Sequence, residues 1–184
     1  MTISRPTTRD IARCGLFAAL IAAGAFVTVP LGPVPFTLQV FAVLLAGLAL
    51  GPRLGALSVT AYLALGLVAP VYAGGTAGVG ILLGPTGGYL IGFPVAAVLT
   101  GLCAGSGPMS PGRLVSAALV GLVPIYVLGP AWLAVQLDLG VGGALSAGVA
   151  PFVVGDVVKA LLAAGVARGL VRLPLGLPAT QRDR

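Results

Sequence analysis

The sequence predicts an all-α integral membrane protein, a bundle of six transmembrane helices with both termini in the cytoplasm. Three observations support this fold class. First, 58% of the 184 residues are hydrophobic and only 8% are charged, whereas a soluble domain carries roughly 25% charged residues. Second, apolar stretches of about 18 residues recur along the whole chain, as in membrane-spanning helices. Third, nine of the ten basic residues lie at the chain ends or in short connections between these stretches.

Six spans are predicted because proline and glycine interrupt the apolar sequence between them. The second span covers about 22 Å and is short against a hydrocarbon core of about 30 Å. The predicted spans are residues 11–29, 36–50, 54–72, 87–104, 113–137 and 149–172. The predicted domain boundaries are a cytoplasmic N-terminal tail at 1–10, a six-helix transmembrane substrate-binding domain at 11–172 and a cytoplasmic C-terminal tail at 173–184.

The arginines predict the orientation, because cytoplasmic connections of membrane proteins are enriched in basic residues. Connections 30–35, 73–86 and 138–148 contain no basic residue. The other connections and the termini hold Arg5, Arg9, Arg13, Arg53, Arg113, Arg168, Arg172, Arg182 and Arg184. Both termini are therefore predicted to be cytoplasmic, and the second, fourth and sixth spans begin at the outer face. The N-terminus also has features of a signal peptide, but this alternation requires it as a first membrane helix.

Asp156 and Lys159 are the sharpest candidate functional residues, because they lie inside an otherwise apolar span. A charge at mid-membrane costs several kcal/mol, and residues three apart share a helix face. One interpretation is a structural ion pair that locks two helices together. The other, which we favour, is recognition of a small polar solute, since aspartate accepts hydrogen bonds from N–H groups and lysine donates to a carbonyl or carboxylate.

Further polar residues stand near the outer ends of the predicted spans. Thr37 and Gln39 begin the second span and Tyr89 the fourth, so these side chains are expected to converge with Asp156 on a cavity that is open to the outside. Gly75 and Thr86 lie in the glycine-rich segments before Tyr89. Glycine allows a backbone to approach a ligand closely, although a flexible turn is an equal alternative from composition alone.

The sequence argues against an enzyme and against a cofactor or metal site. It contains no histidine, the commonest general base and metal ligand. It contains no G-x-x-x-x-G-K-[ST] motif, so no ATP is expected to bind to a phosphate loop of this chain. Ser58, Ser116 and Ser146 could pair with Lys159, but none lies in a nucleophile-elbow sequence. The basic excess follows membrane topology and does not predict nucleic-acid binding.

Four segments stand out along the chain: LGPVPFTLQ at 31–39, LAGLALGP at 45–52, GPTGGYLIGF at 84–93 and GDVVK at 155–159. In this order and spacing they resemble the BioY family, the biotin-binding S component of energy-coupling factor (ECF) vitamin transporters. The resemblance covers roughly residues 11–172. It implies a six-helix bundle, in the plasma membrane of a bacterium or archaeon, that holds one vitamin near the outer face.

The resemblance also implies partners, namely an ECF transmembrane coupling protein and two ATPase subunits, although some relatives resemble solitary transporters. In such S components, small-residue motifs on the first helix contact the coupling protein. The matching residues here are Ala18, Ala19, Ala22 and Ala23. Internal packing or a homo-oligomer contact would use the same stripe. Two alternatives stay open: an S component for a different vitamin, and a structural membrane subunit.

Biotin, the substrate that the resemblance implies, has a ureido ring with two N–H donors and one carbonyl, an apolar thiophane and chain, and a carboxylate. Asp156 would accept a ureido N–H bond, with Thr37, Gln39 and Tyr89 completing the polar set. Lys159 would donate either to the ureido oxygen or to the carboxylate. Residues 73–89 contain no basic residue, so the carboxylate is left to Lys159 or to backbone N–H groups of the glycine-rich loop.

Overall fold

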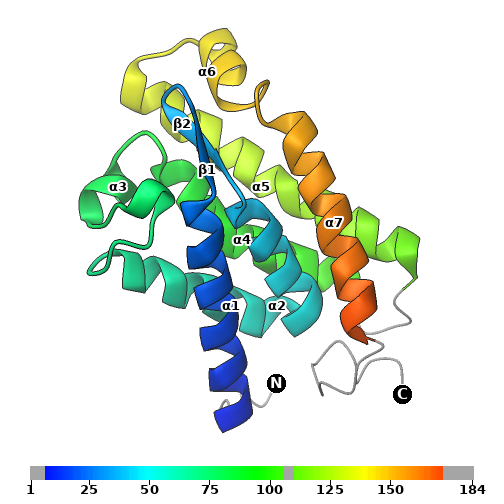
Figure 1. The fold of residues 1–184 in the computed structure, drawn as a ribbon. Helices are drawn as coiled ribbons and strands as arrows, with labels where there is room; N and C mark the ends of the chain where they lie inside the picture. The colour runs from blue at the N-terminus through cyan, green and yellow to red at the C-terminus, as the bar shows by residue number, and fades with distance from the viewer. Residues whose placement is uncertain (1–6, 106–109, 172–184) are drawn as a thin grey trace.

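The computed structural model describes residues 7–105 and 110–171, and in these ranges the chain is mostly helical (Figure 1). The long helices are α1 (Thr8–Phe26), α2 (Gln39–Gly66), α4 (Gly87–Ala104), α5 (Pro111–Leu137) and α7 (Val153–Val171). The shorter elements are strands β1 (Thr28–Leu31) and β2 (Val34–Thr37), a 3-10 turn at Ala73–Gly75, and helices α3 (Val79–Leu83) and α6 (Val141–Gly148). The predicted tail at 173–184 lies outside the described residues.

Helix α1 begins at Thr8, three residues before the first predicted span at 11–29. Its start is fixed by a capping box, in which the Thr7 hydroxyl accepts a hydrogen bond from the Asp10 N–H and the Asp10 carboxylate accepts one from the Thr7 N–H. Such reciprocal bonds satisfy two N–H groups that a helix start leaves free. The bond from the Thr7 backbone also lowers the pKa of the Asp10 carboxyl.

A short antiparallel hairpin, β1–β2, replaces the helical ends predicted at 28–29 and 36–37. Pro30 and Pro35 fix φ and push Val29 and Val34 before them into an extended conformation, and Gly32, which precedes Pro33, makes the turn at φ +80°. In the resulting register Pro30 faces Pro35, and Thr28 faces Thr37. The hairpin thus brings Thr37 to the start of α2.

Helix α2 is sharply bent, and the break predicted at 51–53 is the bend (Figure 1). Gly51 has φ +80° and is followed by Pro52, a combination that no regular helix contains. The second leg ends at Gly66 rather than at residue 72, where the prediction placed it. A side chain at Gly66 would overlap the Tyr72 ring, which folds back against the helix.

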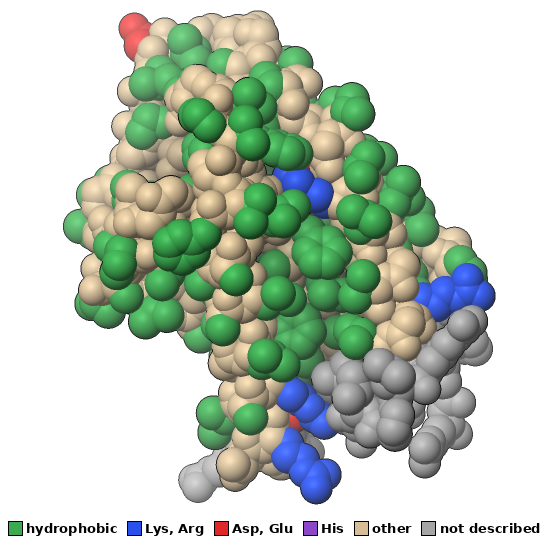
Figure 2. All heavy atoms as spheres, viewed as in Figure 1, with side chains coloured by type: hydrophobic (Ala, Val, Ile, Leu, Met, Phe, Trp, Pro, Cys, Tyr) green, Lys and Arg blue, Asp and Glu red, His purple; other side chains and the backbone are tan. Residues whose placement is uncertain are grey.

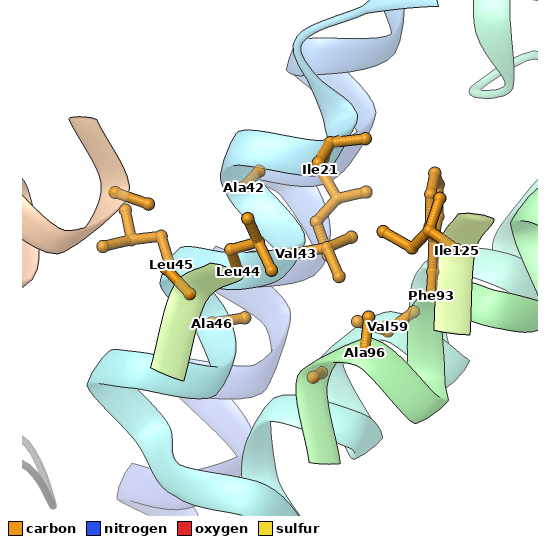
Figure 3. Close-up of a cluster of buried hydrophobic side chains, with 14 of the residues drawn as sticks. Ile21, Ala42, Val43, Leu44, Leu45, Ala46, Val59, Phe93, Ala96 and Ile125 are labelled. Atoms are coloured by element: carbon orange, nitrogen blue, oxygen red, sulfur yellow. The ribbon is translucent and has the colours of Figure 1, made fainter. Parts of the chain in front are cut away.

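The helices pack around an apolar core that α1, α2, α4 and α5 all share. Figure 3 shows Ile21 of α1, Val43 and Leu44 of α2, Phe93 of α4 and Ile125 of α5 converging there. Helix α4 lies against both α2 and α5, and α7 packs on the same two helices. Four different helices therefore meet at one place, which allows distant parts of the sequence to build one site.

The described residues fit a multi-pass membrane protein. Helices α2, α4 and α5 are each long and apolar enough to cross a membrane, and α6 with α7, bent by 50° at the break between them, makes a fourth candidate. Figure 2 shows hydrophobic side chains spread widely over the visible face, whereas lysine and arginine side chains gather mainly at its lower end. In Figure 1, α1 begins and α7 ends at that same end, and the hairpin and α6 lie toward the opposite one.

Candidate functional site

A pocket lies between the β1–β2 hairpin, the start of α2, and helices α3, α4, α5 and α7. The empty space inside it, including open solvent at its mouth, is about 590 Å³. Most of its wall is aliphatic or aromatic. The other lining residues, those with polar or charged groups, are Thr37, Gln39, Tyr72, Thr86, Tyr89, Tyr126, Asp156 and Lys159.

The Asp156 carboxylate is the centre of the polar part of the pocket. The Lys159 ammonium lies 2.7 Å from its Oδ1, and both side chains are about 5% exposed. The Tyr126 hydroxyl on α5 donates a hydrogen bond of 2.7 Å to its Oδ2. A carboxylate offers about four acceptor sites and an ammonium three donors, so the pair is neutralised internally and still has hydrogen-bonding capacity for a ligand.

An aromatic wall supports the lysine. The Lys159 ammonium lies 3.3 Å from the centroid of the Phe36 ring, close enough for a cation–π interaction. The Phe36 ring is stacked with that of Phe152, at a centroid distance of 6.2 Å and an angle of 23°. Gly155 makes this arrangement possible, since a Cβ atom there would overlap the Phe36 ring. The glycine next to Asp156 therefore has a steric role.

A second polar cluster lies where β2 meets α2. The Thr37 hydroxyl donates to the Gln39 Oε1 at 3.0 Å and accepts from the Gln39 backbone N–H at 3.3 Å. The Gln39 Nε2 donates to the Tyr62 hydroxyl at 2.6 Å. All three side chains are buried. Its hydrogen bonds with Thr37 and Tyr62 fix the orientation of the Gln39 side-chain amide. The second N–H of that amide is not used by either bond.

Tyr89 and Thr86 come from the start of α4. The Tyr89 hydroxyl donates to the Gly148 carbonyl at 2.8 Å, and its ring fills space that a side chain at Gly129 would occupy. Tyr89 thus joins α4 to α5 and α6, and its hydroxyl hydrogen is already engaged in a hydrogen bond within the protein. Thr86 is half-buried and its side chain makes no capping hydrogen bond to α4.

Six of the seven predicted binding residues share this one pocket: Thr37, Gln39, Thr86, Tyr89, Asp156 and Lys159. Gly75 is not among the lining residues, and its role in binding stays a prediction. Ala73, from the same turn, does line the pocket, whereas a Cβ atom at Gly75 would lie 3.5 Å from the Phe26 ring of α1.

The predicted partner-contact stripe on α1 is divided between two faces. Ala18 and Ala22 are buried in the core of the chain, whereas Ala19 and Ala23 are exposed. Residues four apart share a face, and a shift of one residue turns the side chain by about 100°. Only Ala19 and Ala23 are therefore available on the surface for another protein.

Among the lining residues that the sequence reasoning missed are Phe36, Tyr126 and Phe152. Phenylalanine in an apolar chain gives no signal that separates a pocket wall from core packing. Tyr126 did carry one, because a tyrosine in the middle of an apolar span needs a hydrogen-bond partner for its hydroxyl. A search of the other spans for a buried acceptor would have led to Asp156.

Comparisons with known proteins agree with this architecture. The BioY family matches residues 1–174. The chain is 46% identical to the probable biotin transporter BioY of Pyrococcus horikoshii over 88% of this chain and 96% of that protein. It is 42% identical to the biotin transporter BioY of Thermotoga maritima, over 90% and 97%.

A solved structure is also similar. The crystal structure of the S component for biotin from an ECF-type ABC transporter superposes with a TM-score of 0.83 and 31% sequence identity, covering 90% of this chain and 92% of that one. The relatives are transport proteins and not enzymes. The family match, the similar relatives and the shared fold lead to one conclusion: this chain belongs to the BioY family.

Proposed function

We propose that this protein is the membrane-embedded substrate-binding subunit for biotin uptake, and that biotin occupies the pocket lined by Asp156 and Lys159. One observation carries the proposal: a buried carboxylate and a buried ammonium lie side by side in a pocket whose remaining wall is largely apolar and aromatic. The names of the similar transporters supply the ligand.

The ureido ring of biotin is complementary to this pair. Its N–H groups match the free acceptor sites of the Asp156 carboxylate, and its carbonyl matches a free N–H of Lys159. Tyr126 and Phe36 hold the carboxylate and the ammonium in place. The thiophane and the chain find an apolar wall that includes Phe93 and Ile125. We thereby assign Lys159 to the ureido end of the ligand.

We place the pocket near the outer face of the plasma membrane of a bacterium or archaeon. Counting α2 as two legs gives six long helical segments in the described chain, and the first begins at the end of the molecule where the last finishes (Figure 1). Arg9, Arg53 and Arg113 mark the cytoplasmic side by the positive-inside rule. The pocket-forming hairpin lies toward the other side.

We further propose that uptake is completed by an ECF transmembrane coupling protein and two ATPase subunits, with independent action as an additional mode. The solved relative comes from an ECF-type ABC transporter, and the exposed Ala19 and Ala23 offer a flat helix surface for close packing. The sequence contains no phosphate loop, so ATP hydrolysis would have to come from a partner.

Equilibrium binding of radiolabelled biotin to the purified protein in detergent tests the proposal. A single site per chain is expected. Asp156→Asn should weaken binding at least tenfold, because one acceptor oxygen becomes a donor. Asp138→Asn, at an exposed acid that does not line the pocket, should not change it. Absence of binding by a folded protein, or tighter binding of riboflavin or thiamine in the same assay, would contradict the assignment.

A further inference from the structure

The pocket has no net charge. Among the residues that the structure describes, its charged lining residues are Asp156 and Lys159, one acid and one base. The arginines in the same ranges are at helix ends or at the bend of α2 and do not line it. An anionic ligand therefore brings a charge that the pocket does not compensate.

The one lysine is already engaged. Its ammonium lies 2.7 Å from the Asp156 carboxylate and sits over the Phe36 ring. If it moved away to meet a ligand carboxylate, it would leave Asp156 buried with only the Tyr126 hydroxyl as a partner. An uncompensated buried charge is strongly unfavourable, so Lys159 is expected to stay beside Asp156.

The wall opposite this pair is neutral. Helix α3 and helix α7 lie on opposite sides of the molecule in Figure 1, and the α3 side contributes Ile81 together with the neighbouring Ala73 and Thr86. Tyr72, next to Ala73, also lines this wall, but its hydroxyl donates to the Leu63 carbonyl. The side chains here thus offer apolar surface and the hydroxyl of Thr86. A ligand whose ureido end meets Asp156 thus directs its other end toward groups that do not select for a negative charge.

We propose that this site recognises the neutral cyclic urea and accepts biotin derivatives whether or not the acyl end is charged. Such derivatives include biotin amide and biotinyl-lysine, in which an amide bond joins biotin to lysine. This inference rests on the proposed function and extends its substrate class. A charge-assisted hydrogen bond to a carboxylate raises affinity roughly tenfold or more. Without such a bond, the dissociation constants of the acid and the amide should lie within about tenfold of each other.

Competition between labelled biotin and unlabelled biotin, biotin amide and biotinyl-lysine, measured on the purified full-length chain, tests this inference. Inhibition constants within about tenfold support it. An amide that binds more than tenfold more weakly than the acid overturns it and leaves the proposed function intact. If biotin itself does not bind, the proposed function fails first, so the two failures are distinguishable.

Adding a cation gives a second, independent readout. Ile81→Arg places a guanidinium on a lining position of α3, whereas Val79→Arg places one on an exposed position of the same helix. Ile81→Arg should create a preference for the acid over the amide of more than about tenfold, and Val79→Arg should leave the ratio unchanged. Ala73→Lys is a substitute if the first variant does not fold. An acid preference that no lining cation changes would overturn the inference, because it would show that the carboxylate is already held.

Discussion

The Lys159 ammonium lies over the face of Phe36, a residue of the hairpin, and this contact fastens the hairpin to helix α7. Cation–π contacts contribute about 0.5–2 kcal/mol, the larger values applying where water is excluded. Phe36→Leu should therefore weaken biotin binding by about 1 kcal/mol, measured by calorimetry in detergent. Phe26→Leu, at an exposed ring on α1, is the matched control, and equal effects of the two substitutions would argue against the contact.

Gly155→Ala should disturb the same wall from the other side. The new methyl group would overlap the Phe36 ring, and overpacking of this kind typically costs about 1–3 kcal/mol. Both the melting temperature and the affinity for biotin are expected to fall. Gly165→Ala on the same helix meets no atom within 4 Å and should be neutral or slightly stabilising. Similar losses in both variants would point to a general need for glycine in α7.

Tyr126→Phe should lower the affinity for biotin by removing one donor from the Asp156 carboxylate. Hydrogen bonds to charged groups contribute about 1.5–3 kcal/mol. If Tyr126 acts through Asp156, the two substitutions Tyr126→Phe and Asp156→Asn will not be additive. A double-mutant cycle on the biotin dissociation constant measures this, and strict additivity would show that Tyr126 acts elsewhere.

Lys159→Met should destabilise the fold as well as the site. Breaking a buried ion pair by removing one partner costs about 3–5 kcal/mol, whereas replacing both partners by apolar residues is often neutral. The double variant Asp156→Leu with Lys159→Met is thus expected to recover most of the free energy of unfolding in detergent but to bind no biotin. If the double variant bound biotin, the Asp156–Lys159 pair would have only a structural role, that of holding helices together.

The orientation predicts which sites an impermeant thiol reagent reaches in intact cells. After replacement of Cys14 and Cys103 by alanine, a cysteine at the exposed Ser146 of α6 should react from outside. A cysteine at the exposed Gly112, at the start of α5, should react only after the cells are permeabilised. The reverse labelling pattern would show that the topology is opposite to the one proposed, with the pocket toward the cytoplasm.

The sequence predicted much of this molecule where a single residue carries a strong local signal. The helix expected at 87–104 is observed as Gly87–Ala104, because glycine and proline mark both of its ends. Asp156 and Lys159 were identifiable for the same reason, since charge is rare and costly inside a membrane.

Other features depend on distant contacts and could not be predicted locally. Tyr126 and Asp156 are 30 positions apart, and their meeting depends on how α5 and α7 are rotated against each other. Phe36 was placed at the start of a helix, whereas the neighbouring prolines put it on a strand. The exposed and buried halves of the alanine stripe on α1 likewise depend on which face the other helices cover.

The proline pair of the hairpin limits how its two strand edges can pair with another chain. A free strand edge is a template for pairing with another chain. Where Pro30 faces Pro35, neither residue has an N–H to offer, so an approaching strand finds no donor at the middle of either strand. Pro35, which also lines the pocket, therefore belongs to a pair that disfavours edge-to-edge pairing of this hairpin with another strand.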